Sequence, residues 1–298
     1  MIGLVALALG VAAPAAAAPP RILSINPCID AVLVRVADAR QIAALSHYSR
    51  DPRATSIPLA VARRFPATSG TAEEVVALAP DIVVAGGHVD PATQGALARL
   101  GIRLVKYPVP SSIAESIAQV RDIARVAGQR TRGEVLARRI EAALTPVTAP
   151  PVSALIWQGG GMVPGAGTLA DDLLRHAGFR NFSADLGLSQ WDVLGLEYLA
   201  ARPPRVLFTP PGMQDRVLAH PVVRRLGART ALRDFAPRLL FCGGPAIPEA
   251  LAVLRAARAS LAPSPWGGAR DGAAGPGVGL TKGPSLTVEQ PAKGSSRD

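Results

Sequence analysis

Residues 112–144 read SIAESIAQVRDIARVAGQRTRGEVLARRIEAAL, and their apolar side chains recur with the period of a helix rather than that of a strand. The repeating apolar positions are Ile113, Ile117, Val120, Ile123, Ala124, Ala127, Val135, Leu136 and Ile140. Ser112 with Glu115 is a capping-box pattern, and the stretch contains no proline. It therefore predicts one long helix over residues 111–145, roughly 50 Å in length. Gly128 and Gly133 leave a break in this helix as the alternative.

Short apolar runs alternate with helical patterns on both sides of this stretch. Before it, strands are predicted at 21–25, 42–45, 81–85 and 103–107, with helices at 28–37, 73–78 and 93–100. After it, strands are predicted at 153–157, 205–209 and 238–242, with helices at 169–177, 195–201, 214–219 and 248–261. Such alternation favours parallel sheets. The fold class is therefore α/β, with one lobe over residues 21–110, a second over 146–261, and the long helix between them.

The two predicted lobes share an internal repeat. EEVVALAPDIVVA begins at Glu73, and EYLAARPPRVLFT begins at Glu197, an offset of 124 residues. In each copy a short helical pattern is ended by a proline, Pro80 or Pro204, seven residues after the glutamate, and an apolar strand pattern follows. The same order on both sides of the long helical stretch favours an internal duplication.

The composition narrows the classes of function. The net charge is +10, yet only three residues are lysine, and the 29 arginines are scattered along the chain. No basic run is interleaved with aromatic residues, which make up 4% of the chain, and this argues against a nucleic-acid-binding protein. A positive surface or cleft that suits anionic ligands remains consistent with the charge.

The two ends of the chain have compositions unlike the rest. Residues 2–18, IGLVALALGVAAPAAAA, are apolar, short for a bilayer span, and end in an Ala-x-Ala-like sequence. They predict a signal peptide over residues 1–20 and export to the periplasm. The missing basic residue near Met1 leaves an uncleaved membrane anchor as the alternative. Residues 262–298 are rich in Gly, Pro and Ser and are predicted to be a disordered tail.

The sequence contains two cysteines, Cys28 and Cys242, separated by 214 residues. Both are expected at strand ends that face a cleft, one in each lobe. Three interpretations stay open: a disulfide that locks the lobes together, soft ligation of a metal with help from His47 or His88, or two semi-buried thiols. No CxxC pattern or His/Cys cluster points to a structural zinc site.

The chain resembles the cluster A (class III) substrate-binding proteins of ABC importers, the group that carries vitamin B12 and iron–siderophore complexes. The resemblance covers residues 21–261 and is carried by the long helix and by the motifs RILSINPCIDAVL, LSHYSRDP, EEVVALAPDIVVAGG and WDVLGLEYLAARPPRVL. It implies two Rossmann-like lobes bridged by a rigid helix, with a ligand held in the cleft between them. It also implies that one glutamate of each lobe, Glu73 and Glu197, docks on arginines of a permease dimer in the inner membrane. The alternative is that both acids only stabilise the N-termini of their helices.

Candidate ligand contacts follow from the carboxyl ends of the predicted parallel strands and from the resemblance. The candidates are Tyr48, Trp191, His47, Arg50, Trp157 and His88. Tyr48 and Trp191 match pocket positions of the B12-binding branch, and Arg50 suits an anionic chelate. Packing in a core is the alternative for Trp157, and packing at a lobe edge is the alternative for Trp191. Gly86-Gly87 stands where the B12-binding branch carries an aromatic residue, so cobalamin, an iron–siderophore and heme all remain open as ligands.

The first rival to an importer component is a nucleotide-dependent two-lobed enzyme. GAGTLA at residues 165–170 fits the glycine pattern of a nucleotide-binding loop, but Gly165 lies eight residues beyond the end of the predicted strand. A ligand-binding sensor or scavenger without an importer is the second rival. The chain is expected to be a monomer with no catalytic residues and no resident cofactor.

Overall fold

The computed structural model describes residues 18–212, 215–216, 218–221, 223 and 229–261 of the 298-residue chain. Nearly all of the predicted signal peptide and the whole predicted tail lie outside these residues, as does part of the helix predicted at 214–219. Within them, no helix combines the length and the apolar character that crossing a bilayer requires.

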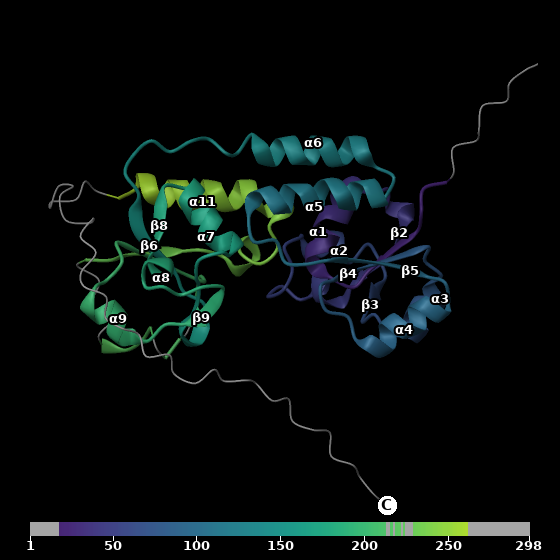
Figure 1. The fold of residues 1–298 in the computed structure, drawn as a ribbon, viewed down its shortest axis with the longest axis horizontal. Coiled ribbons are helices and arrows are strands. Elements are labelled where there is room, and N and C mark those ends of the chain that lie inside the picture. The colour runs from purple at the N-terminus through teal and green to yellow at the C-terminus, as the bar shows by residue number, and fades with distance from the viewer. Residues whose placement is uncertain (1–17, 213–214, 217, 222, 224–228, 262–298) are drawn as a thin grey trace, which may run out of the picture. The chain divides into compact units, whose positions relative to one another are not determined.

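The N-terminal lobe is built on a five-stranded parallel sheet (Figure 1). Its strand order is β3-β2-β1-β4-β5. The strands are β1 (Ile22–Ser24), β2 (Ile42–Ser46), β3 (Ala67–Thr68), β4 (Ile82–Gly86) and β5 (Arg103–Tyr107). The helices are α1 (Pro27–Val36), α2 (Leu59–Ala62), α3 (Ala72–Leu78) and α4 (Pro91–Arg99). The central strands β1 and β4 are buried along most of their length, as a sheet covered on both faces requires.

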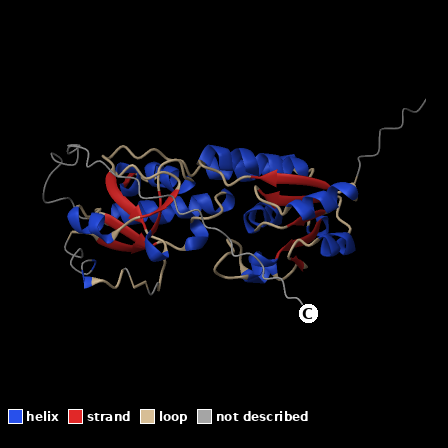
Figure 2. Ribbon diagram, turned by 60° about the horizontal axis from the view of Figure 1, so that its bottom comes forward, coloured by secondary structure: helices blue, strands red, loops and turns tan. Residues whose placement is uncertain are grey.

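The C-terminal lobe contains a four-stranded parallel sheet in the order β11-β10-β6-β8. These strands are β6 (Val152–Ile156), β8 (Phe179–Asn181), β10 (Val206–Thr209) and β11 (Ala231–Asp234), and a separate antiparallel pair is formed by β7 (Met162–Pro164) and β9 (Trp191–Val193). Its helices are α7 (Leu169–His176), α8 (Phe182–Asp185), α9 (Leu196–Ala201) and α11 (Ile247–Ala259). Figure 2 shows the strands of the two lobes gathered in two groups.

The strand predicted at residues 238–242 is wrong. Pro237–Leu239 form a 3-10 turn, and the loop that follows it carries Cys242. The edge strand of the sheet is β11 instead, which pairs with β10 in parallel from Ala231 to Asp234. Leu239 and Leu240 are buried in the core, so the apolar run in the sequence reflected burial rather than pairing in a sheet.

The duplication predicted from the sequence is visible in the strand orders. The order β2-β1-β4-β5 of the first lobe matches β8-β6-β10-β11 of the second. Ile82 of β4 pairs with the first strand of its lobe, and Val206 of β10, 124 residues later, does the same in the other lobe. The two-lobed α/β class predicted from the sequence is therefore confirmed.

The single helix predicted over residues 111–145 is wrong. The stretch forms two helices, α5 (Ile113–Val126) and α6 (Arg130–Glu141), which pack side by side as an antiparallel pair (Figure 1). Gly128 takes a left-handed conformation, φ +71°, and the amide of Gln129 donates back to the carbonyl of Ala124 at 2.7 Å. This is a Schellman end, which closes α5 and turns the chain back. Ser112 caps the start of α5 as predicted, by accepting from the amide of Glu115.

The helix pair connects the lobes in place of one long helix. At the start of α5, the amide of Ile113 donates to Asp172 of α7 in the C-terminal lobe at 2.8 Å. At its end, the carbonyl of Ala127 accepts from Gln41 of the N-terminal lobe at 2.9 Å. After α6 the chain reaches the C-terminal lobe again, where Ala143 accepts from Arg255 of α11. One buried apolar cluster contains residues of α1, α5, α6, α7 and α11 together, so the lobes share a core.

Candidate functional site

A cavity of about 260 Å³ lies between residues of the two lobes and α5. Its lining from the N-terminal lobe consists of Asn26, Cys28, Ile29, Val32, Gly86, Gly87 and His88. The segment Tyr107, Pro108, Val109 and Pro110 and the α5 residues Ser116, Gln119, Val120 and Ile123 form another side. Phe241, Cys242 and Gly244 complete it from the C-terminal lobe. The cavity therefore lies at the carboxyl ends of β4 and β5, where ligands of parallel sheets bind.

The cavity lining carries little charge. His88 is the only basic side chain in the lining, and the lining contains no carboxylate. The Tyr107 hydroxyl donates to Asp122 at 2.8 Å. Burial and this carboxylate raise the pKa of Tyr107 well above its ordinary value, so the phenol stays neutral. The Gln119 side chain donates to the carbonyl of Pro108 at 2.7 Å. Such a lining favours an apolar or aromatic ligand surface over a strongly charged one.

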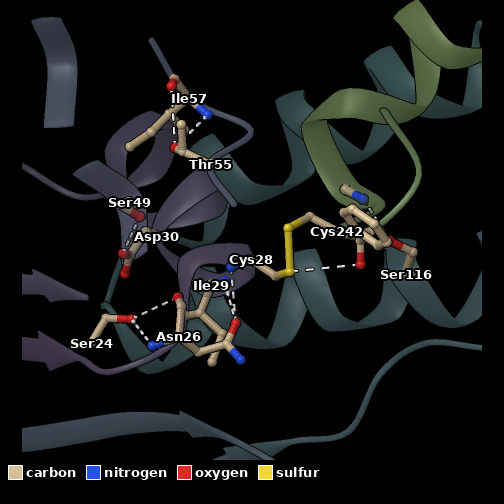
Figure 3. Close-up of a disulfide and its surroundings, with 12 residues drawn as sticks. Ser24, Asn26, Cys28, Ile29, Asp30, Ser49, Thr55, Ile57, Ser116 and Cys242 are labelled. Atoms are coloured by element: carbon tan, nitrogen blue, oxygen red, sulfur yellow. Dashed lines mark hydrogen bonds between the residues drawn. A yellow bond between two sulfur atoms is a disulfide. The ribbon is translucent and has the colours of Figure 1, made fainter. Parts of the chain in front are cut away.

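Cys28 and Cys242 form a disulfide at the edge of this cavity, with their Cα atoms 4.7 Å apart (Figure 3). The interpretations of two free thiols and of metal ligands are thereby ruled out. No group of three or more His, Cys, Asp or Glu that could hold a metal was found in the described part of the chain. Asn26 caps α1 by accepting from the amides of Cys28 and Ile29, so the first half of the bridge sits on a fixed helix start.

Gly86 and Asn26 explain one departure from the B12-binding branch. A Cβ atom on residue 86 would lie 2.8 Å from the side-chain nitrogen of Asn26, which caps α1. A side chain at this position would displace the cap, so the aromatic residue of the B12-binding branch would not fit at residue 86. Gly87 is more open, because its nearest obstacle is Pro108 at 3.6 Å.

The predicted aromatic contacts are exposed and lie in two places. The rings of His47 and Tyr48 lie 4.0 Å apart in the N-terminal lobe, and Tyr48 is 52% exposed. Trp191 begins β9 in the C-terminal lobe, is 38% exposed, and its ring lies 6.4 Å from that of Phe241. Phe241 lines the cavity and was not predicted from the sequence. Each lobe thus presents exposed aromatic rings, and the pair in the C-terminal lobe adjoins the cavity through Phe241.

The remaining three candidates differ in position. His88 is exposed and lines the cavity. Arg50 is exposed, and its guanidinium donates to the carbonyl of Phe65 at 2.7 Å. Trp157 is fully buried in the C-terminal lobe, and its indole nitrogen donates to Asp215 at 2.8 Å. Its side chain therefore has the packing role that the sequence also allowed.

A buried carboxyl holds the turn that carries His47 and Tyr48. Asp30 of α1 is fully buried and accepts from the Ser49 hydroxyl at 2.6 Å (Figure 3). It also accepts from the Ser46 amide at 2.9 Å. Its second oxygen has no hydrogen-bond partner. Burial raises the pKa of Asp30 to about 7, in spite of these hydrogen bonds.

The glycine-rich segment 165–170 does not form a free phosphate-binding loop. Gly165 and Ala166 pair through their backbones with residues 188–190, and a Cβ on residue 165 would lie 2.5 Å from the carbonyl oxygen of Leu188. Thr168 caps α7 by accepting from the amide of Asp171. The glycine at position 165 serves close packing of two backbone segments, which accounts for the pattern without a nucleotide.

Glu73 and Glu197 occupy equivalent places in the two lobes. Each lies in the first turn of a helix, α3 or α9, and each is exposed. The carboxylate of Glu197 lies against the backbone of Gly195, in the space that a Cβ on residue 195 would fill. Both positions favour an acidic residue through the helix dipole, and both leave the carboxylates at the surface.

Residues 22–231 match the model of a protein family described as periplasmic binding protein. The chain belongs to this family. Periplasmic binding proteins capture ligands and are not enzymes, so the nucleotide-dependent enzyme is excluded. None of the curated proteins matches the chain.

Solved structures of periplasmic binding proteins share this fold. Heme-binding protein RhuT from Roseiflexus sp. RS-1 is 21% identical, with a TM-score of 0.63, over 80% of this chain and 99% of that one. Heme-binding HutB of Vibrio cholerae is 16% identical, with a TM-score of 0.67, over 80% and 98% of the two chains. Vitamin B12-binding BtuF of the same organism is 16% identical, with a TM-score of 0.62, over 80% and 96%. The resemblance to class III substrate-binding proteins is thus confirmed at the level of the fold.

Proposed function

We propose that the protein is the substrate-binding component of an ABC importer that captures a metal chelate in the periplasm. The observation that carries the proposal is a nearly uncharged cavity between the lobes, next to the exposed rings of Phe241 and Trp191. Its volume of about 260 Å³ is below the range of typical ligand pockets, so a chelate would extend from it onto exposed side chains. A tetrapyrrole suits these surfaces better than a charged iron–siderophore, and the flat, largely apolar macrocycle of heme suits them better than the amide-bearing corrin of cobalamin.

Several exposed groups have the chemistry that such a ligand requires. The imidazoles of His47 and His88 and the phenol of Tyr48 can supply an axial ligand to iron or cobalt. Arg50 can pair with a carboxylate on the ring edge. The heme-binding and B12-binding titles of the structural neighbours support the same ligand class. The signal peptide predicted over residues 1–20 supports export to the periplasm.

The ligand is identified by titrating the purified protein with hemin, cyanocobalamin and a ferric siderophore. Absorbance and tryptophan quenching report binding, and mass spectrometry identifies what co-purifies from the periplasm. We expect a tetrapyrrole to bind, with affinity lowered about tenfold or more by Trp191→Ala, because an aromatic contact is lost. Trp157→Phe is the matched control, since Trp157 lies in the core. No binding of any of the three, or unchanged affinity in Trp191→Ala, would contradict the proposal.

We further propose that Glu73 and Glu197 dock on a permease dimer, one glutamate from each lobe. Reversing both charges, Glu73→Arg with Glu197→Arg, is expected to abolish ligand uptake by cells and leave ligand affinity unchanged, because neither residue lines the cavity. Asp234→Arg on β11 is the matched control, since Asp234 is also an exposed acid. Uptake that survives the double reversal would instead favour a sensor or scavenger that works without a permease.

A further inference from the structure

Residues 241–244, named here the 241–244 loop, join the C-terminal lobe to two elements outside it. Cys242 is bonded to Cys28 at the start of α1. The amide of Gly244 donates to the hydroxyl of Ser116 in α5 at 2.7 Å, and this bond is buried. The loop is thus tied to the N-terminal lobe covalently and to the connecting helix by a hydrogen bond.

The glycines of this loop are required by its conformation and its packing. Gly243 and Gly244 both have positive φ, +57° and +50°. A Cβ on residue 243 would lie 2.8 Å from both Ser116 Oγ and a methyl group of Leu169. Only glycine fits such a position without strain, and the close approach brings Cys242 within reach of Cys28.

The disulfide also restricts the position of Phe241, the residue before Cys242. The carbonyl oxygen of Phe241 lies 3.7 Å from Sγ of Cys28, a contact rather than a hydrogen bond because a disulfide sulfur carries no hydrogen. The Phe241 ring is 43% exposed, lines the cavity, and lies 6.4 Å from the ring of Trp191. An exposed aromatic ring on a loop would otherwise sample several positions.

We propose that the Cys28–Cys242 disulfide is a positioning device for the ligand, which holds Phe241 in the cavity wall beside Trp191. The ligand-binding form is then the oxidised chain. The inference rests on the proposed function, since it concerns the affinity of the same site. A disulfide that only stabilised the fold would raise the melting temperature and leave the affinity of the folded protein unchanged.

The test compares hemin affinity in a double-mutant cycle between the disulfide and the ring, at a temperature where every variant is folded. Cys28→Ala with Cys242→Ala is expected to raise the Kd for hemin about tenfold, mostly through faster dissociation. Phe241→Ala should raise it by a similar factor, and the triple variant should be little worse than either, because both changes remove the same contact. Phe241→Tyr, which keeps the ring, should retain the affinity. Effects that multiply in the triple variant would overturn the proposal.

Two further arms separate this inference from loss of stability and from failure of the proposed function. Leu199→Ala lowers stability in a buried cluster of the C-terminal lobe that does not line the cavity, so its hemin Kd should not change. If the wild-type protein binds no hemin, the proposed ligand is wrong, and amide exchange still tests the positioning. The Gly244 amide should then exchange at least tenfold faster in the double cysteine variant than in Leu199→Ala. Equal exchange in the two variants would overturn the inference without reference to any ligand.

Discussion

Gly133→Ala is expected to destabilise the protein by about 1–3 kcal/mol, although alanine is the better helix former. Gly133 is buried in α6, and a Cβ on it would overlap the Cβ of Ala124 in α5. The two helices would have to separate to accept one methyl group. Urea unfolding followed by circular dichroism measures the change.

The sign of this effect distinguishes the helix pair from one continuous helix. In one unbroken helix, residue 133 would not lie against Ala124, and the same substitution would stabilise the protein by about 1 kcal/mol. Gly95→Ala is the matched control, because Gly95 lies inside α4 and a Cβ there meets only the flexible end of Arg99 at 3.5 Å. It should stabilise by about 0.5–1 kcal/mol. A stabilising Gly133→Ala would disprove the packing of α5 on α6.

Replacing Asp30 with asparagine is expected to remove a large pH dependence of stability. The folded-state pKa of Asp30 is raised to about 7 from 3.8, so the folded protein holds a proton that the unfolded chain releases. The contribution of Asp30 to stability is therefore greatest below about pH 4, declines as the pH rises, and is lost above about pH 7. A shift of this size corresponds to about 4 kcal/mol. The unfolding free energy of wild type minus that of Asp30→Asn should fall by this order between pH 4 and pH 8.

Glu74 provides a control of opposite sign. Hydrogen bonds from Thr68 and Ser69 lower the pKa of Glu74, so its contribution is present at neutral pH and lost as the pH falls. The difference between wild type and Glu74→Gln should therefore rise with pH, whereas that for Asp30→Asn falls. Parallel pH curves for wild type and Asp30→Asn would show that Asp30 does not change its charge on unfolding.

The regular elements could be predicted where local sequence and tertiary structure agree. The repeat beginning at Glu73 and Glu197 gave the helix-proline-strand unit and the duplicated strand order, because β4 and β10 are central strands with continuous apolar sequence. β11 was missed because ALRD is a half-exposed edge strand with two charged residues. The prediction of one long helix was wrong because the apolar residues keep a helical period through the turn between α5 and α6. The turn itself depends on the positive φ of Gly128.

The candidate site was harder to predict, because it is assembled by contacts distant in sequence. Cys28 and Cys242 were recognised as cleft residues, but their pairing depends on a loop that the sequence presented as a strand. Phe241 went unnoticed for the same reason, although its position beside Cys242 was a usable signal. Trp157 was expected at an exposed strand end, whereas its side chain packs in a buried cluster of the C-terminal lobe and its indole nitrogen donates to Asp215.

The resemblance attributed a fixed spacing of the lobes to one rigid helix between them. The shared core provides this spacing instead. α5 contributes buried residues such as Ile117 and Val120, which pack in one cluster with residues of both lobes. Separating the lobes would expose this surface to water, at a cost of about 25 cal/mol for each Å² of apolar area.

The pairing of the two cysteines has a consequence for how the protein matures. Cys28 belongs to the first helix, and its partner follows 214 residues later, just before the last helix. The 298 residues contain no third cysteine, so a single chain can oxidise to one product only. Exchange between mispaired disulfides is a slow step for many exported proteins, and two cysteines offer no mispaired form to correct. Within these 298 residues, formation of the bond therefore needs an oxidant but no exchange of one disulfide for another.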